Sequence, residues 1–253
     1  MKKLLVLGLA IAAIAVTGAL TASAASAAVG EFDFACNIDT ECFVNGEQKT
    51  ENVFTVNGGV VKCTKAVFSG KSTAAEGGTT VTTKGTTNHD WAIHILKIHP
   101  EYTGCTFIGQ TAEVTTTGCF YTLSVTVSVT INQWSGSVTI SCEGTNVITV
   151  KAVTAGCTVK VGPQTPANNV VDFTKEEAGG LKDILVTSTV GTETHAAGHT
   201  GIVYTSSGGA CGASGENGYY RGTVTEKAYS DSAHTKQVSG TIVETVSATE
   251  IVE

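Results

Sequence analysis

Three of the six histidines recur every five residues, and imidazole is a common metal ligand. On a strand, this spacing puts His94 on the face opposite His89 and His99. On a helix, successive histidines of the series lie about 140° apart. Another pair, His195 and His199, has helical i, i+4 spacing, but it lies among strand and loop residues and lacks the glutamate base of the zinc-protease motif. The sequence therefore predicts no metal site.

A glycine-rich loop near residue 211 offers two nucleophiles, Cys211 and Ser214. A hydrolase needs a base within reach of its nucleophile, and no G-x-S-x-G motif or associated His and acid is found here. The acidic residues also show no specific pair of the kind that cleaves glycosides. We therefore predict a protein that is not an enzyme, with no catalytic residue and no cofactor.

Aromatic side chains beside amides are better candidates for binding. Trp134 lies at a predicted hairpin tip, and two tyrosines follow the glycine-rich loop. Exposed aromatic rings can stack on sugars or anchor a protein partner. In the alternative interpretation, Trp134 folds back over a neighbouring strand and one of the tyrosines belongs to the core. The predicted ligand-contacting patch consists of Asn132, Gln133, Trp134, Tyr219, Tyr220 and Arg221.

The overall charge makes nucleic acid an improbable partner. The chain of 253 residues has 15 Lys and Arg against 22 Asp and Glu, and Arg221 is the only arginine. Neutralising phosphates requires clustered basic side chains. An acidic, sparsely charged protein should also be repelled by anionic lipid surfaces.

The first 28 residues have the pattern of a secretory signal peptide. Lys2 and Lys3 precede an apolar run over 4–20, and the small residues of 21–28 follow, with two A-x-A sequences. A retained membrane anchor is the alternative, since about 17 apolar residues approach the length needed to span a bilayer. Cleavage would remove two lysines, leaving 13 basic against 22 acidic side chains. We expect a secreted protein that has no membrane contact after cleavage.

All eight cysteines lie after this segment. An even number in an exported chain is typical of a disulfide framework, whereas the paired C-x-x-C spacings of zinc sites do not occur. Spacing suggests that Cys36 and Cys42 form a local bridge and that the other six link strands. The predicted disulfide cysteines are Cys36, Cys42, Cys63, Cys105, Cys119, Cys142, Cys157 and Cys211.

Residues of alternating polarity dominate the rest of the chain. In 125–131 every odd position is Val or Ile and every even position is Ser or Thr, which predicts a strand with one buried and one solvated face. Similar segments recur between turn residues such as those of 57–59 and 143–146. The sequence thus predicts an all-β fold, an antiparallel sandwich or closed sheet with Greek-key or meander connections, stapled by disulfides. The proline-containing segment 162–169 suggests β-regions over 29–162 and 163–253, which could also form one continuous domain.

Four segments carry a resemblance to known proteins: 59–64 (GVVKCT), 100–107 (PEYTGCTF), 118–121 (GCFY) and 157–164 (CTVKVGPQ). Together they resemble exported, β-rich, cysteine-containing proteins of high-GC Gram-positive bacteria, over most of residues 50–225. That group has no assigned activity, so the resemblance implies a bacterial, extracellular protein and assigns no site residue.

Two classes of function fit these observations. The first is a non-catalytic exported protein, a structural or adhesion-like binding component of the cell envelope. It would have a glycan or protein partner at the cell surface, or would associate with itself. The second is a secreted carbohydrate-binding or carbohydrate-active protein on a β-sandwich. Folds of this kind host many functions, so architecture alone does not decide between them.

Overall fold

The computed structural model describes residues 31–57, 59–82, 89–193 and 200–245. This part of the chain is almost entirely antiparallel strand, interrupted by two short 3-10 helices, η1 (Ala74–Glu76) and η2 (Gly209–Cys211). The predicted all-β antiparallel class is confirmed. Within the ranges given, no helix has the length and hydrophobicity needed to cross a bilayer. The predicted signal peptide lies outside the described residues.

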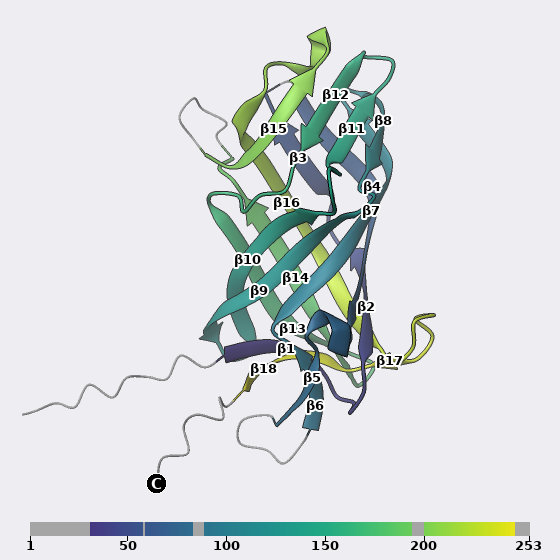
Figure 1. Cartoon of the computed structure of the whole chain (residues 1–253), viewed down its shortest axis with the longest axis vertical. Coiled ribbons are helices and arrows are strands. Elements are labelled where there is room, and N and C mark those ends of the chain that lie inside the picture. The colour runs from purple at the N-terminus through teal and green to yellow at the C-terminus, as the bar shows by residue number, and fades with distance from the viewer. Residues whose placement is uncertain (1–30, 58, 83–88, 194–199, 246–253) are drawn as a thin grey trace, which may run out of the picture.

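Eight strands of the larger sheet close into a ring, which we call the lower ring (Figure 1). Each strand is hydrogen-bonded to the next, and the pairing of the last with the first completes the circle. In order around the ring, the strands are β2 (Cys42–Gln48), β4 (Gly59–Ser72), β7 (Ile95–Phe107), β9 (Cys119–Thr130), β10 (Gln133–Cys142), β13 (Asn169–Ala178), β14 (Leu181–Val190) and β16 (Gly215–Tyr229).

A second closed ring, the upper ring, uses the other halves of β4, β7 and β16. Five further strands complete it: β3 (Asn52–Val56), β8 (Gln110–Thr115), β11 (Ile148–Ala152), β12 (Cys157–Val161) and β15 (Ile202–Ser207). The three shared strands are 14, 13 and 15 residues long, or about 43–50 Å at about 3.3 Å per residue. This length allows them to run through both rings, which stack end to end along the long axis (Figure 1).

A small four-stranded sheet lies at the far end of the lower ring (Figure 1). One of its core contacts with the ring is an edge-to-face pair between Phe34 and Phe173, whose ring centroids are 5.4 Å apart. A two-residue strand, β17 (Gln237–Val238), pairs with β16 nearby. The small sheet contains, in order, β18 (Gly240–Thr245), β1 (Glu31–Cys36), β6 (His89–Ile93) and β5 (Thr79–Thr82).

Alternation predicts the buried face correctly where strands are paired on both sides. In β12, Cys157, Val159 and Val161 are buried and the residues between them are not. The prediction for 125–131 is wrong beyond Val125, since Val127, Val129 and Ile131 are 50%, 59% and 90% exposed. The reason is that β7 pairs with β9 only over 121–124, so the end of the β9–β10 hairpin extends past the strands that would cover it.

The hydrogen-bonding pattern is that of closed sheets, and it does not confirm the finer expectation of a two-layer sandwich. Strands from both predicted regions also pair with each other: β13 joins β10, β15 joins β12, and β16 joins β2 and β3. The buried apolar residues of both rings form one continuous core. The division into 29–162 and 163–253 stays a prediction.

All eight cysteines are disulfide-bonded, as predicted. Cys36–Cys42 is the expected local bridge, joining β1 to β2. Cys63–Cys105 links β4 to β7, and Cys119–Cys142 links β9 to β10. Cys157–Cys211 ties β12 to the η2 turn that follows β15. Disulfides of this density are typical of proteins that fold in an oxidising compartment.

Candidate functional site

The residues of the predicted ligand-contacting patch do not lie together in the structure. Trp134 is half-buried and packs against the core from β10, as in the alternative interpretation, while Asn132 and Gln133 are exposed at the hairpin turn. Around the lower ring, β10 lies three strand steps from β16, about 14 Å across the sheet. The β16 residue in register with Trp134 is Val224, four residues or about 13 Å along the strand from Tyr220.

The three residues predicted on β16 also differ from one another in environment. Tyr219 is 7% exposed, so it belongs to the buried part of the protein. Tyr220 lines an internal cavity. Arg221 is exposed and lies 3.8 Å from a Glu193 carboxylate oxygen. The structure therefore does not bring these side chains together with Trp134, and ligand contact by any of them stays a prediction.

The other candidate chemistries are also constrained by the structure. Cys211 has no free thiol because it is bonded to Cys157, which removes it as a nucleophile. His94 Nδ1 lies 3.2 Å from a carboxylate oxygen of Asp33, and His99 Nδ1 lies 2.9 Å from the backbone carbonyl oxygen of Cys119. Among the described residues, no group of three or more His, Cys, Asp or Glu could hold a metal ion. His195 and His199 lie outside those residues.

The described residues enclose a cavity of about 90 Å³. Its lining extends through both rings, and most of the lining side chains are apolar and buried. Along β16 alone it runs from Tyr220 to Glu226, about 20 Å of extended chain. A cavity of this volume exceeds the roughly 15 Å³ that one water molecule requires. It is therefore large enough for several atoms of a guest molecule.

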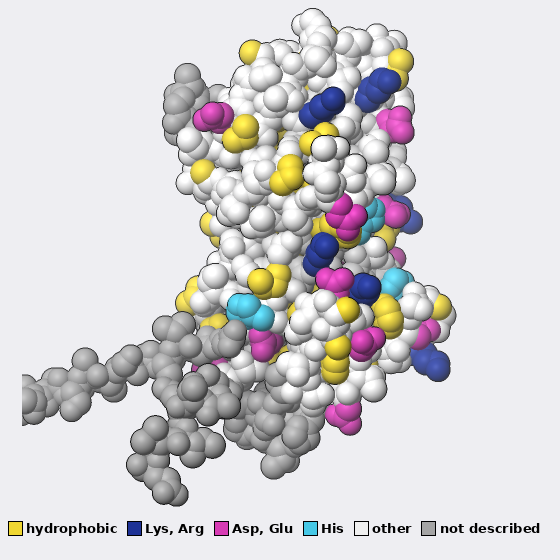
Figure 2. Space-filling view, in the orientation of Figure 1, with side chains coloured by type: hydrophobic (Ala, Val, Ile, Leu, Met, Phe, Trp, Pro, Cys, Tyr) yellow, Lys and Arg dark blue, Asp and Glu magenta, His cyan; other side chains and the backbone are white. Residues whose placement is uncertain are grey.

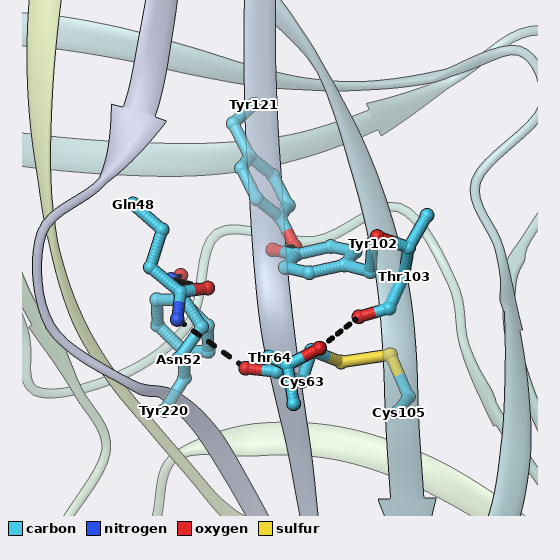
Figure 3. Close-up of a disulfide and its surroundings, with 9 residues drawn as sticks. All are labelled: Gln48, Asn52, Cys63, Thr64, Tyr102, Thr103, Cys105, Tyr121 and Tyr220. Atoms are coloured by element: carbon cyan, nitrogen blue, oxygen red, sulfur yellow. Dashed lines mark hydrogen bonds between the residues drawn. A yellow bond between two sulfur atoms is a disulfide. The ribbon is translucent and has the colours of Figure 1, made fainter.

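A cluster of tyrosine hydroxyls lies where the two rings meet. The hydroxyls of Tyr102 and Tyr121 are 2.9 Å apart, and Tyr102 also interacts with the side chain of Tyr220. Tyr220 Oη donates to Asn52 Oδ1. Figure 3 shows these side chains together beside the Cys63–Cys105 bridge, which fixes β4 to β7 at this level.

The same network continues to the backbone and satisfies its own polar groups. Asn52 Nδ2 donates to Gln48 Oε1 at 3.0 Å, and Gln48 Nε2 donates to the carbonyl of Cys63 at 3.3 Å (Figure 3). Burial raises the pKa of Tyr121 to about 12, and it raises the pKa of Tyr102 and of Tyr220 well above the usual value. The three phenols are thus neutral hydrogen-bonding groups at physiological pH.

Glu226 differs from this cluster because its carboxyl has no partner among the residues that the structure describes. The side chain is 5% exposed and lines the cavity from β16, and its Oε2 atom is buried without a hydrogen bond. Burial alone raises the pKa of Glu226 to about 8, since no nearby cation offsets the loss of hydration. Buried carboxyls are normally hydrogen-bonded or paired, so this one is unusual.

The carboxyl has its space because the neighbouring strand carries a glycine. A Cβ atom at Gly46 on β2 would overlap both oxygens of Glu226. On its other side, Glu226 lines a second cavity of about 30 Å³, whose lining includes Phe34 of the small sheet. Glu226 therefore lies between the central cavity and the sheet at the end of the lower ring.

Sequence reasoning missed Glu226, although a signal was present. The alternating residues of 222–227 predict a strand, and every second residue of β16 from Gly222 to Ala228 is buried. Glu226 lies two residues after the inward-facing Val224 on the same strand, so its side chain is an acid on the core side of β16. Its isolation could not be predicted, because the neighbours that leave it unpaired come from distant parts of the chain.

The chain matches no protein-family model, no curated protein and no solved structure. The resemblance to exported proteins of high-GC Gram-positive bacteria stays a prediction, and the function must be argued from the geometry. That geometry combines apolar walls, hydroxyls that already bond to one another, and one unpaired carboxyl. It is suited to holding an apolar molecule through a single polar group.

Proposed function

We propose that this chain is an exported, non-catalytic binding protein that holds a small apolar molecule in its central cavity. The observation that carries the proposal is the apolar cavity running through both closed rings, with an unpartnered carboxyl in its wall. This function belongs to the binding branch of the class predicted from the sequence.

The free-energy cost of an empty cavity supports the proposal that a ligand occupies it. Protein interiors are close-packed, and an internal void forfeits the contacts of every side chain around it. Leaving a carboxyl unpaired in such a void adds a further cost. A guest molecule would restore contacts along the walls of the cavity and provide a partner for its polar group.

The proposal of export rests on the four disulfides and on the signal-like pattern of residues 1–28. We expect the mature protein in the culture medium of a secreting host, with its N-terminus close to residue 25 or 28. N-terminal sequencing of that material tests the proposal. Recovery of the protein with residues 1–28 still attached would contradict it.

The binding proposal can be tested with a cavity-filling variant. Val150 is 3% exposed and lines the cavity from β11, whereas Val153, just beyond that strand, is 69% exposed. We expect wild type to bind the neutral fluorophore N-phenyl-1-naphthylamine with enhanced emission. Val150→Phe should weaken this binding at least tenfold, and the matched control Val153→Phe should leave it unchanged.

The test rests on the difference in fluorophore binding between Val150→Phe and Val153→Phe. Circular dichroism and urea unfolding would establish that Val150→Phe remains folded. Failure of wild type to bind the fluorophore, or equal binding by folded Val150→Phe and wild type, would refute a ligand-holding function. Equal losses in both variants would place the fluorophore on the outer surface.

A second candidate, self-association as a structural or adhesion component, is favoured by the end of the β9–β10 hairpin. Residues 126–130 of β9 pair with β10 on one side, and no described strand pairs with them on the other. Figure 2 shows a face with wide uncharged areas, on which several acidic and basic side chains lie next to one another. Edge strands with little charge can pair with another chain. A monomer in size-exclusion chromatography at high concentration would count against this candidate.

The carbohydrate-binding alternative receives less support. It relied on Trp134 acting together with Tyr219 and Tyr220, which the fold separates. Trp134 is also half-buried against the core rather than fully presented at the hairpin tip.

A further inference from the structure

We propose that the ligand of the central cavity is an amphiphile with an elongated apolar body and a primary or secondary amine, whose ammonium group pairs with the Glu226 carboxylate. This inference rests on the proposed function and specifies the chemical class of its ligand. The juxtaposition that carries it is an apolar cavity with a single unsatisfied, 5%-exposed carboxyl in its wall.

The polar groups of the cavity differ in whether they already have hydrogen-bond partners. Tyr102, Tyr121, Tyr220 and Asn52 already bond within their own network, so they require nothing from a guest. Glu226 lies six residues along β16 from Tyr220, about 20 Å, and takes no part in that network. A ligand therefore gains most by placing its polar group at Glu226 and its apolar body along the walls.

No charged side chain on the packed elements satisfies this carboxyl. Gly46 on β2 faces it, and Ile184 is its register partner on β14. Lys227, the next residue on β16, interacts electrostatically with Asp183 instead. Asp183 is buried and also accepts a hydrogen bond from Gln237, and Lys227 lines the smaller cavity together with Glu226. Burial is nevertheless the one cause of the raised pKa of Glu226, so neither charge offsets it.

The chemistry of a buried carboxylate selects an amine over other polar groups. Glu226 releases its proton to solvent when an ammonium binds, because the ammonium supplies both the opposite charge and the hydrogen-bond donors that an ionised carboxylate lacks in an apolar site. An alcohol supplies one donor and no charge. A carboxylate ligand would bring an uncompensated negative charge into an apolar cavity whose own carboxyl is kept protonated by burial, which is unfavourable.

Competition among ligands of equal chain length tests the proposal. Decylamine, 1-decanol and decanoate would be titrated against bound N-phenyl-1-naphthylamine at pH 7.5. We expect wild type to bind decylamine about 30-fold more tightly than 1-decanol, the size expected for a desolvated, hydrogen-bonded charge pair. Decanoate should be the weakest competitor.

Glu226→Gln keeps the shape of the side chain and removes its charge. In this variant decylamine should compete no better than 1-decanol, while the fluorophore still binds. The matched control is Glu47→Gln, since Glu47 is exposed on the neighbouring strand β2. It should retain the preference for the amine, which controls for the loss of one negative charge from the protein.

Failure of the amine assignment and failure of the proposed function give different experimental results. Equal competition by decylamine and 1-decanol in wild type, or a preference that survives Glu226→Gln, would overturn the amine assignment while the cavity remains a binding site. Absence of fluorophore binding in wild type would overturn the proposed function, and the amine assignment with it.

Discussion

The buried Glu226 should make the folded protein less stable as the pH rises, and Glu226→Gln should abolish that loss. In the folded state the pKa of this carboxyl is raised to about 8 by burial, from an ordinary value of 4.5. Between these two values the folded state keeps a proton that the unfolded chain has released. Raising the pH therefore favours unfolding throughout this interval.

The magnitude follows from the width of the interval. Each pH unit within it corresponds to about 1.4 kcal/mol in the free energy of unfolding. Below about pH 4.5 the carboxyl is protonated in both states and contributes no pH dependence. Relative to Glu226→Gln, wild type should thus lose about 4 kcal/mol between pH 5 and pH 8, and the loss should level off above pH 8.

Urea unfolding with the disulfides intact, followed by tryptophan fluorescence from pH 5 to pH 8.5, measures this difference. Wild type and Glu226→Gln should be nearly equal in stability at pH 5 and should diverge steadily above it. Glu47→Gln, which alters an exposed acid on β2, controls for the change in net charge. Parallel stability curves for wild type and Glu226→Gln would show that the carboxyl is not held neutral by burial, and the reasoning would be refuted.

Two further predictions concern the framework around the cavity. The bridge Cys36–Cys42 spans a sequence separation of 6, and Cys157–Cys211 spans 54. Replacing the first pair by alanine should lower the free energy of unfolding by about 2 kcal/mol, and replacing the second should lower it by about 4 kcal/mol, because the longer loop loses more entropy when it is closed. Equal losses for the two variants in urea unfolding would contradict this loop-entropy argument. Gly136→Ala should cost about 2 kcal/mol or more, because its Cβ would overlap the carbonyl of Ser124 on β9. Gly162→Ala, where the added Cβ meets nothing within 4 Å, should change the thermal midpoint little, and similar shifts for the two variants would argue against the close approach of β9 and β10.

Local patterns in the sequence determined the strands of this protein and the two faces of each strand. Alternating residues define two faces of a strand whatever its partners, so β12 could be predicted with its buried positions. Glycine before cysteine marks left-handed backbone, as the φ of 66° at Gly118 and 60° at Gly156 shows. A third glycine before a cysteine, Gly104, has φ 61° and lies inside β7.

The tertiary structure alone decided which strands are neighbours, and therefore what the interior contains. Closing the lower ring requires β16 to pair with β2, some 180 residues earlier in the chain, and no local pattern specifies that partner. Alternation likewise cannot tell whether a face will be covered, which is why Val129 is exposed at the end of its hairpin. A cavity is the volume that side chains from many strands leave unfilled, so the isolation of Glu226 beside Gly46 arises only when both rings are closed.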